Sequence, residues 1–167
     1  SQAGERTWDA DEVPANAAPF TPTRLRVKDR RGKVVDTIRS TEPLTVECEY
    51  QLTAPITGLR VGMYLNTMRG EYVFTAFDTD DAKQFEQFGA RAAGRYVSRC
   101  EIPADFFNEG RYYLGVNASS FGVKRYFMDE NAISFNVDIS GAPGTQWPEL
   151  RQGPIRPRLN WKIEKID

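Results

Sequence analysis

The chain has 167 residues, with 22 basic and 23 acidic side chains and a net charge of −1. This length suits one domain with its own core, and a composition of 40% apolar and 27% charged residues is globular rather than disordered. The balanced charge creates no overall field for nucleic acid or anionic lipid, so no nucleic-acid partner is expected. No apolar run reaches the roughly 18 residues that span a bilayer, so direct membrane insertion is not expected either.

Histidine is absent from the chain, which removes the usual general base and the commonest metal ligand. We therefore expect no catalytic residues, no metal and no cofactor. The two cysteines, Cys48 and Cys100, are too few for a disulfide-dependent secreted scaffold, and a reducing compartment fits them best. The amino-terminal residues lack the pattern of a signal peptide, and a chain that starts at Ser1 is expected to be a domain excised from a longer protein.

Residues 1–22 contain three prolines and five alanines without sustained periodicity, which predicts a linker or an extended arm. The ordered domain is expected over residues 23–167, with a tail rich in Pro and Gly from about residue 141. Short alternating runs with turn residues between them predict antiparallel strands. These strands are expected at residues 24–28, 33–38, 44–52, 59–66, 72–77, 95–102, 110–118, 132–139 and, in the tail, 159–166.

A short helix is expected after Asp81, which could cap it, with Phe85 and Phe88 on one face. The remaining pattern of about seven or eight strands over ~120 residues is typical of an all-β, immunoglobulin-like antiparallel sandwich. Tyr112 near the start of the strand 110–118 predicts a tyrosine corner. Leu114 stands where an immunoglobulin core cysteine would be, so packing alone is expected to hold the sheets together.

Three sets of acidic or thiol side chains could form a catalytic, metal or disulfide site, but each has a simpler interpretation. Glu47 and Glu49 lie about 6.6 Å apart along one strand face, yet alternating glutamates are usual on a solvated face. The run 78–81 (DTDD) lacks the ligand spacing of a calcium loop, so a turn and a helix cap are favoured. Cys48 and Cys100 fall on neighbouring strands and are expected to be reduced core residues, with a disulfide as the alternative.

A polar face provides the candidate site. The strands 59–66, 110–118 and 132–139 are expected to be neighbours in one sheet, and their outward residues combine aromatic rings with amides, hydroxyls and charges. Sugars need this mixture, because their C–H faces stack on rings while their hydroxyls need planar donors and acceptors. A plain solvated face is the alternative. The predicted carbohydrate-binding residues are Arg60, Tyr64, Asn66, Arg111, Tyr113, Asn117, Ser134 and Asn136, beside Asp138.

Six segments carry a resemblance to a known family, in the same order along the chain: 57–66 (TGLRVGMYLN), 70–79 (GEYVFTAFDT), 94–96 (GRY), 100–103 (CEIP), 110–114 (GRYYL) and 153–161 (GPIRPRLNW). Together they resemble the C-terminal, Wzt-type domain of the ATP-binding subunit of O-antigen polysaccharide ABC transporters. The resemblance covers most of the chain from about residue 23.

The resemblance implies a cytoplasmic domain at the inner face of the bacterial inner membrane, which recognises the end of a lipid-linked O-antigen polysaccharide and couples recognition to export. It implies as partners the ATPase domain and the membrane subunit of the transporter. It also implies a homodimer formed by exchanged terminal strands, a role open to residues 159–166. The sugar-contacting positions do not follow from the family.

Two other functions remain open. A carbohydrate-binding module of a secreted glycoside hydrolase would share the sandwich and the aromatic face, although the scarce cysteines and the missing signal peptide speak against it. A structural immunoglobulin-like domain would instead mediate protein association through its tail strand and would bind no glycan. An enzyme is the least favoured class because histidine is absent.

Overall fold

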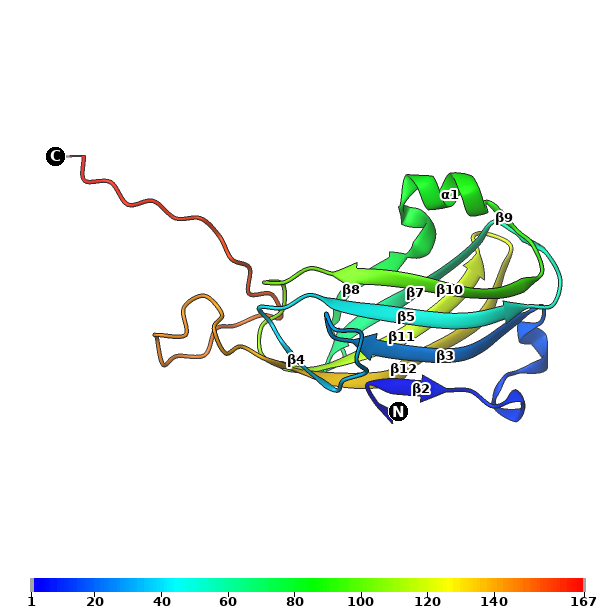
Figure 1. The fold of residues 1–167 in the computed structure, drawn as a ribbon, viewed down its shortest axis with the longest axis horizontal. Coiled ribbons are helices and arrows are strands. Elements are labelled where there is room, and N and C mark those ends of the chain that lie inside the picture. The colour runs from blue at the N-terminus through cyan, green and yellow to red at the C-terminus, as the bar shows by residue number, and fades with distance from the viewer. Residues whose placement is uncertain (1, 167) are drawn as a thin grey trace.

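The computed structural model describes residues 2–166, which form a mainly antiparallel β-sandwich in which only β1 and β4 pair in parallel among the described residues. One sheet has six strands, in the order β1 (Gln2–Ala3), β12 (Lys124–Asp138), β11 (Gly110–Ser120), β7 (Leu59–Thr67) and β8 (Tyr72–Phe77), with β4 (Thr37–Arg39) also paired to β12. The facing sheet has four strands, in the order β10 (Gly94–Ile102), β5 (Leu44–Leu52), β3 (Phe20–Lys28) and β2 (Glu5–Thr7). Figure 1 shows the two layers, which confirm the predicted fold class.

Strict alternation of apolar and polar residues builds the core. On β7 the residues Leu59, Val61, Met63 and Leu65 are buried, because successive side chains of a strand point to opposite faces. The predicted neighbours in the six-stranded sheet are confirmed, since β11 pairs with β7 on one side and with β12 on the other. This arrangement directs the polar residues of all three strands to the outer face of the sheet.

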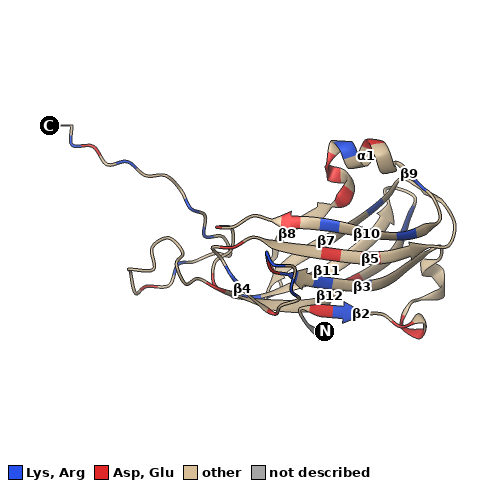
Figure 2. Cartoon of the chain, in the orientation of Figure 1, with Lys and Arg blue, Asp and Glu red and all other residues tan. Residues whose placement is uncertain are grey.

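The outer face of the four-stranded sheet is held by ion pairs. Glu47 of β5 accepts hydrogen bonds from Arg26 (2.9 Å) and Arg99 (2.8 Å), and the Nζ atom of Lys28 lies 2.9 Å from it. Arg26 also donates to Glu49 at 2.6 Å. Acidic and basic positions accordingly lie side by side on β2, β3, β5 and β10 (Figure 2). Glu47 and Glu49 thus form ion pairs with basic side chains of their own sheet.

The predicted short helix is present as α1 (Ala82–Phe88), which follows the 3-10 turn η3 (Asp78–Asp80). Asp81 caps it by accepting hydrogen bonds from the backbone N–H groups of Lys83 (3.0 Å) and Gln84 (3.2 Å). A two-stranded pair, β6 (Ile56–Thr57) with β9 (Ala90–Arg91), closes the same end of the sandwich. The cap and turn interpretation of residues 78–81 is therefore confirmed.

The amino-terminal residues, predicted as a linker or an extended arm, pack on the sandwich. β1 and β2 join opposite sheets, two 3-10 turns follow at Ala10–Glu12 and Ala15–Ala17, and β3 already begins at Phe20. The reason is apolar anchoring: Trp8 packs edge-on against Phe127 with ring centroids 5.6 Å apart, and Phe20 stacks on Tyr50 at 5.1 Å. Burying these rings stabilises a segment that has no periodicity of its own.

Two strand boundaries also differ. The strand expected at 33–38 is reduced to β4 (Thr37–Arg39), with Val34 in an isolated bridge to Lys28. In contrast, β12 starts at Lys124, eight residues before the predicted start at residue 132. Residues 124–131 lack alternation, but β11 supplies their hydrogen-bonding partners across two bulges.

The predicted tyrosine corner is confirmed. The hydroxyl of Tyr112 donates to the carbonyl oxygens of Asn108 (2.9 Å) and Pro154 (3.0 Å), and burial raises its pKa to about 12. Asn108 and the buried Arg156 hold the first part of the tail against the sandwich through further hydrogen bonds. The expected absence of an inter-sheet disulfide at this place follows from the buried Leu114.

The tail beyond Arg156 forms no strand among the described residues, whereas the sequence predicts one at 159–166. It leads away from the sandwich as the red trace in Figure 1. Leu159, Trp161, Ile163 and Ile166 are each 63–96% exposed. A strand needs a partner for its backbone groups, and one copy of the chain offers none here.

Within residues 2–166, the chain has no helix of the length and apolar character that a membrane crossing requires.

Candidate functional site

The structure places all eight predicted residues on the outer face of the six-stranded sheet. Tyr113 lies at the centre, opposite Asn66 of β7 and opposite Ser134 of β12. Arg111 lies opposite Asn136 in the next row. The residues between them in sequence are core residues, so the polar set shares one face.

Hydrogen bonds order the side chains around Tyr113. The guanidinium of Arg111 donates to Ser134 Oγ at 2.6 Å and to Asn136 Oδ1 at 3.3 Å. The amide of Asn117 donates to the hydroxyl of Tyr64 at 2.7 Å. These bonds hold one arginine and one tyrosine ring in place before any ligand arrives, which lowers the entropy cost of binding.

Two buried amide oxygens on this face have no partner. Asn66 is 7% exposed and Asn117 is 5% exposed, and neither Oδ1 atom accepts a hydrogen bond from a described residue. A buried polar atom without a partner costs about 1–3 kcal/mol, so these positions call for an explanation. These two acceptors lie beside tyrosine rings, and they can receive the hydroxyl donors of a ligand only when the side chains that cover them move aside.

Arg60 does not join this cluster. It pairs in register with Ser119, eight residues along β11 from Arg111, a separation of roughly 27 Å at the usual strand rise. Its guanidinium lies over the ring of Phe77, 4.0 Å from the centroid, and near Phe121 at 5.1 Å. The predicted residues therefore span a long surface rather than one compact site.

Tyr72 was missing from the predicted set. It lies on β8 opposite Asn66, packs edge-on against Tyr64 with centroids 5.8 Å apart, and is largely exposed. Met128 of β12, opposite Asn117, adds an apolar side chain to the same face. Tyr72 lay within a predicted strand, but a bulge between Leu65 and Asn66 sets its register, and a bulge is invisible in the sequence.

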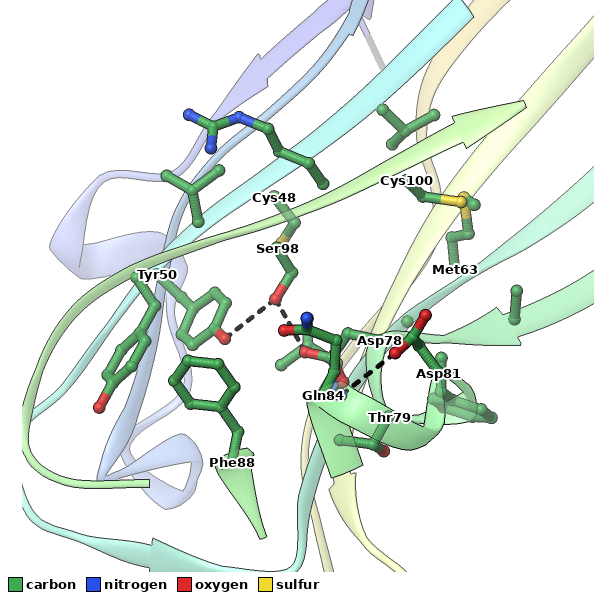
Figure 3. Close-up of a pocket in the computed structure, with 18 of the residues that line it drawn as sticks. Cys48, Tyr50, Met63, Asp78, Thr79, Asp81, Gln84, Phe88, Ser98 and Cys100 are labelled. Carbon is green, nitrogen blue, oxygen red and sulfur yellow. Dashed lines mark hydrogen bonds between the residues drawn. The ribbon is translucent and has the colours of Figure 1, made fainter. Parts of the chain in front are cut away.

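A second feature is a pocket of about 540 Å³ between the two sheets, where β8 and β10 form their edges. Figure 3 shows Cys48, Met63, Ser98 and Cys100 around it. Asp78 anchors its polar side, where Oδ2 accepts hydrogen bonds from Ser98 (2.8 Å) and Arg91 (3.1 Å). No sequence pattern pointed to this pocket, because its walls come from both sheets and from α1.

Both cysteines line this pocket and both are free thiols, as the sequence analysis favoured. Cys48 lies opposite Ser98, and Cys100 lies opposite Val46, so the two are diagonal neighbours on β5 and β10. Burial raises the pKa of Cys48 to about 12 and also raises the pKa of Cys100. Neither thiol is therefore a ready nucleophile at neutral pH.

Two packed sheets with a bulged, polar outer face define an immunoglobulin-like β-sandwich domain. The chain belongs to the Wzt C-terminal domain family, whose model matches residues 23–147. Its fold is similar to the crystal structure of the C-terminal domain of Wzt, with a TM-score of 0.67 and 10% identity over 98% of this chain and 93% of the other.

The CARDB domain of a Pyrococcus furiosus protein, solved in complex with di-metal ions, is also similar in part. It has 14% identity over 72% of this chain and 91% of the other, and a TM-score of 0.38, which is too low to inform the fold or the function. A search of the curated proteins finds no match to the chain.

Proposed function

We propose that this domain recognises a bacterial O-antigen polysaccharide, at its terminal region, without changing it chemically, and couples that recognition to export by an ABC transporter. Membership of the Wzt C-terminal domain family supports a role in such a transporter. One observation carries the recognition step: the unpartnered, buried oxygens of Asn66 and Asn117 lie on a face that also presents Tyr64 and Tyr113.

Binding on this face follows from the chemistry of a sugar. When the side chains over Asn66 Oδ1 and Asn117 Oδ1 move aside, hydroxyl groups donate to these two atoms, while the C–H face of a ring packs on Tyr64 or Tyr113. Arg111, already bonded to Ser134 and Asn136, has further N–H groups for ring or hydroxyl oxygens. A shallow site of this kind has an affinity of about −4 to −8 kcal/mol, in the millimolar to micromolar range.

The proposed setting is the cytoplasmic face of the inner membrane. The ATPase domain and the membrane subunit of the transporter are the proposed partners. A homodimer would offer two sites to one polymer and raise the avidity by effective concentration, provided that the glycan reaches both.

Calorimetric titration with the purified O-polysaccharide of the source bacterium, beside a foreign glycan, tests the proposal. We expect selective binding that resists added salt, because few of the contacts are ionic. Tyr64→Ala and Tyr113→Ala should each weaken it by about fivefold or more, since a stacked ring contributes about 1 kcal/mol or more.

Tyr96→Ala is the matched control, because Tyr96 belongs to β10 of the four-stranded sheet. It should leave glycan affinity unchanged. If the native polymer shows no binding even at concentrations well above millimolar, the proposed glycan recognition is refuted. A purely structural role in protein association then gains support. Equal losses from all three substitutions would refute the outer face as the site.

A further inference from the structure

The pocket between β8 and β10 opens the core of the sandwich. Its inner walls are the aliphatic side chains of Leu25 and Val46 from one sheet and Val61 and Met63 from the other, all core residues. A volume of about 540 Å³ falls in the range of small-molecule sites, roughly 300–1,000 Å³. Binding of an apolar group in the pocket is favourable, because it removes this apolar surface from contact with water.

Most of the polar groups inside the pocket already form hydrogen bonds with one another. Ser98 donates to Asp78, and the hydroxyl of Tyr50 bonds to Ser98 at 3.0 Å (Figure 3). The hydroxyl of Tyr50 also accepts from Arg91 at 2.5 Å. The backbone N–H of Val61 donates to the other oxygen of Asp78 at 3.0 Å. A sugar ring placed here would leave most of its hydroxyl groups without partners, at a cost of about 1–3 kcal/mol each.

One buried donor is left over. The Nε atom of Arg91 has no hydrogen-bond partner among the described residues, and Arg91 is only 3% exposed. The rings of Tyr50, Phe88 and Tyr96 surround its guanidinium at 5.8–6.0 Å. Its Nη1 and Nη2 atoms are bonded to Tyr50, Asp78 and the Leu59 carbonyl, so this side of the pocket is predominantly apolar.

The mouth of the pocket indicates the charge of the ligand. Thr79 and Gln84 contribute a hydroxyl and an amide, and Asp81 and Glu101 contribute carboxylates (Figure 3 labels all but Glu101). Neither carboxylate forms an ion pair within the described chain, whereas Arg99 at the same rim is paired with Glu47. This rim disfavours an anionic head group and favours an uncharged one.

We propose that this pocket binds the alkyl chain of an amphipathic molecule whose uncharged polar head stays at the rim formed by Thr79 and Gln84. The pocket lies on the inner side of the six-stranded sheet, so the proposal is independent of glycan recognition on the outer face.

Methyl NMR of the chain with ¹³C-labelled methionine tests it, because the three methionines report three places. Met63 lines the pocket, Met128 lies on the outer face opposite Asn117, and Met68 is exposed in the β7–β8 turn. n-Octyl β-D-glucoside below its micelle concentration should shift Met63 and leave Met68 and Met128 in place. Glucose should shift none of them, and octanoate should bind more weakly than the glucoside.

Cys100→Phe and Ala76→Met, which fill the pocket from opposite sheets, should each weaken glucoside binding by about tenfold. Val123→Phe adds the same ring as the first variant at an exposed loop position and should change nothing. Circular dichroism checks the fold of each variant. If Cys100→Phe does not fold, the glucoside affinity of Ala76→Met tests the pocket by itself.

Four outcomes overturn the proposal. In the first two, the Met63 methyl signal does not shift with the glucoside, or it shifts equally with glucose. In the third, every filled variant that folds binds the glucoside as tightly as the original chain. In the fourth, the Met63 signal changes only with protein concentration, which would mean that a second copy fills the pocket. In the same spectra, a shift of the Met128 methyl signal on addition of the O-polysaccharide tests the proposed function separately. Either proposal can therefore fail without affecting the test of the other.

Discussion

At the scale of single residues, Glu47 illustrates how a buried charge is accommodated. Its carboxylate is nearly covered, and three cations, Arg26, Lys28 and Arg99, contact it from both neighbouring strands. Burial by itself would raise the pKa of Glu47, but hydrogen bonds from Lys28, Arg99 and Arg26 outweigh it and lower the pKa to about 2. Glu47 is thus ionised at neutral pH and cannot serve as a general acid.

This pKa leads to a prediction about acid stability. Because the folded-state pKa lies below the ordinary value of 4.5, the stabilisation is complete above about pH 4.5 and is lost as the pH falls toward 2. The loss should reach about 2 kcal/mol, after allowance for the solvent exposure of Arg99. Urea unfolding at a series of pH values measures it.

Glu47→Gln should lower the free energy of unfolding at pH 7, and its difference from the original chain should shrink between pH 4.5 and 2. Glu101→Gln, which removes a carboxylate without an ion pair in the described chain, is the control and should show no such convergence. A difference for Glu47→Gln that stays constant with pH would contradict the ion-pair explanation.

At the scale of elements, α1 has seven residues and depends on its cap and on contacts rather than on helix propensity. Asp81→Ala removes the acceptor for two backbone N–H groups and should cost about 1 kcal/mol. Hydrogen exchange of the amides of residues 82–88 should then become about fivefold faster, because that energy corresponds to such a factor. Lys83→Ala is the control, and equal acceleration in both variants would show that the cap does not stabilise α1.

The strands show a similar dependence on partners. Residues 44–52 alternate so strictly that β5 has the predicted bounds, whereas residues 124–131 become part of β12 only because β11 lies beside them. The unpredicted β2 likewise exists through its pairing with β3. The alternation of apolar and polar residues predicts a strand where one face of that strand is buried in the core. It does not predict a strand that is stabilised mainly by pairing with a neighbouring strand.

At the scale of the whole molecule, the tail is the largest exposed apolar segment. Apolar residues at 159, 161 and 163 alternate with Asn160, Lys162 and Glu164, the pattern of a strand with one buried face. Arg156 and Arg158 fix the start of the tail, Arg158 through an ion pair with Asp105, so the segment from Leu159 onward is free to reach a second copy. This supports the homodimer that we propose.

Removal of residues 159–167 should convert a dimer into a monomer, as measured by sedimentation equilibrium. Trp161→Asp with Ile163→Asp should have the same effect, because both changes place charge on the apolar side of the strand. Lys162→Ala with Glu164→Ala alters the opposite side and should preserve the dimer. A monomeric original chain would refute the dimer, and a dimeric truncated chain would refute the role of the tail.

The sequence by itself determined the central strands, the cap of α1 and the start of the tyrosine corner, because each depends on residues close together in the chain. The succession of alternating strands indicated the class of fold, and six segments in a fixed order indicated the family. It also placed Tyr64, Tyr113 and their neighbours on one face, since alternation within strands settles orientation. Only the tertiary structure decided that residues 2–22 pack on the sandwich, that Arg60 lies apart from Arg111, and that Asn66 and Asn117 keep unpartnered oxygens. It alone created the pocket between β8 and β10, because bulges, edge pairing and the gap between two sheets arise from contacts between residues far apart in sequence.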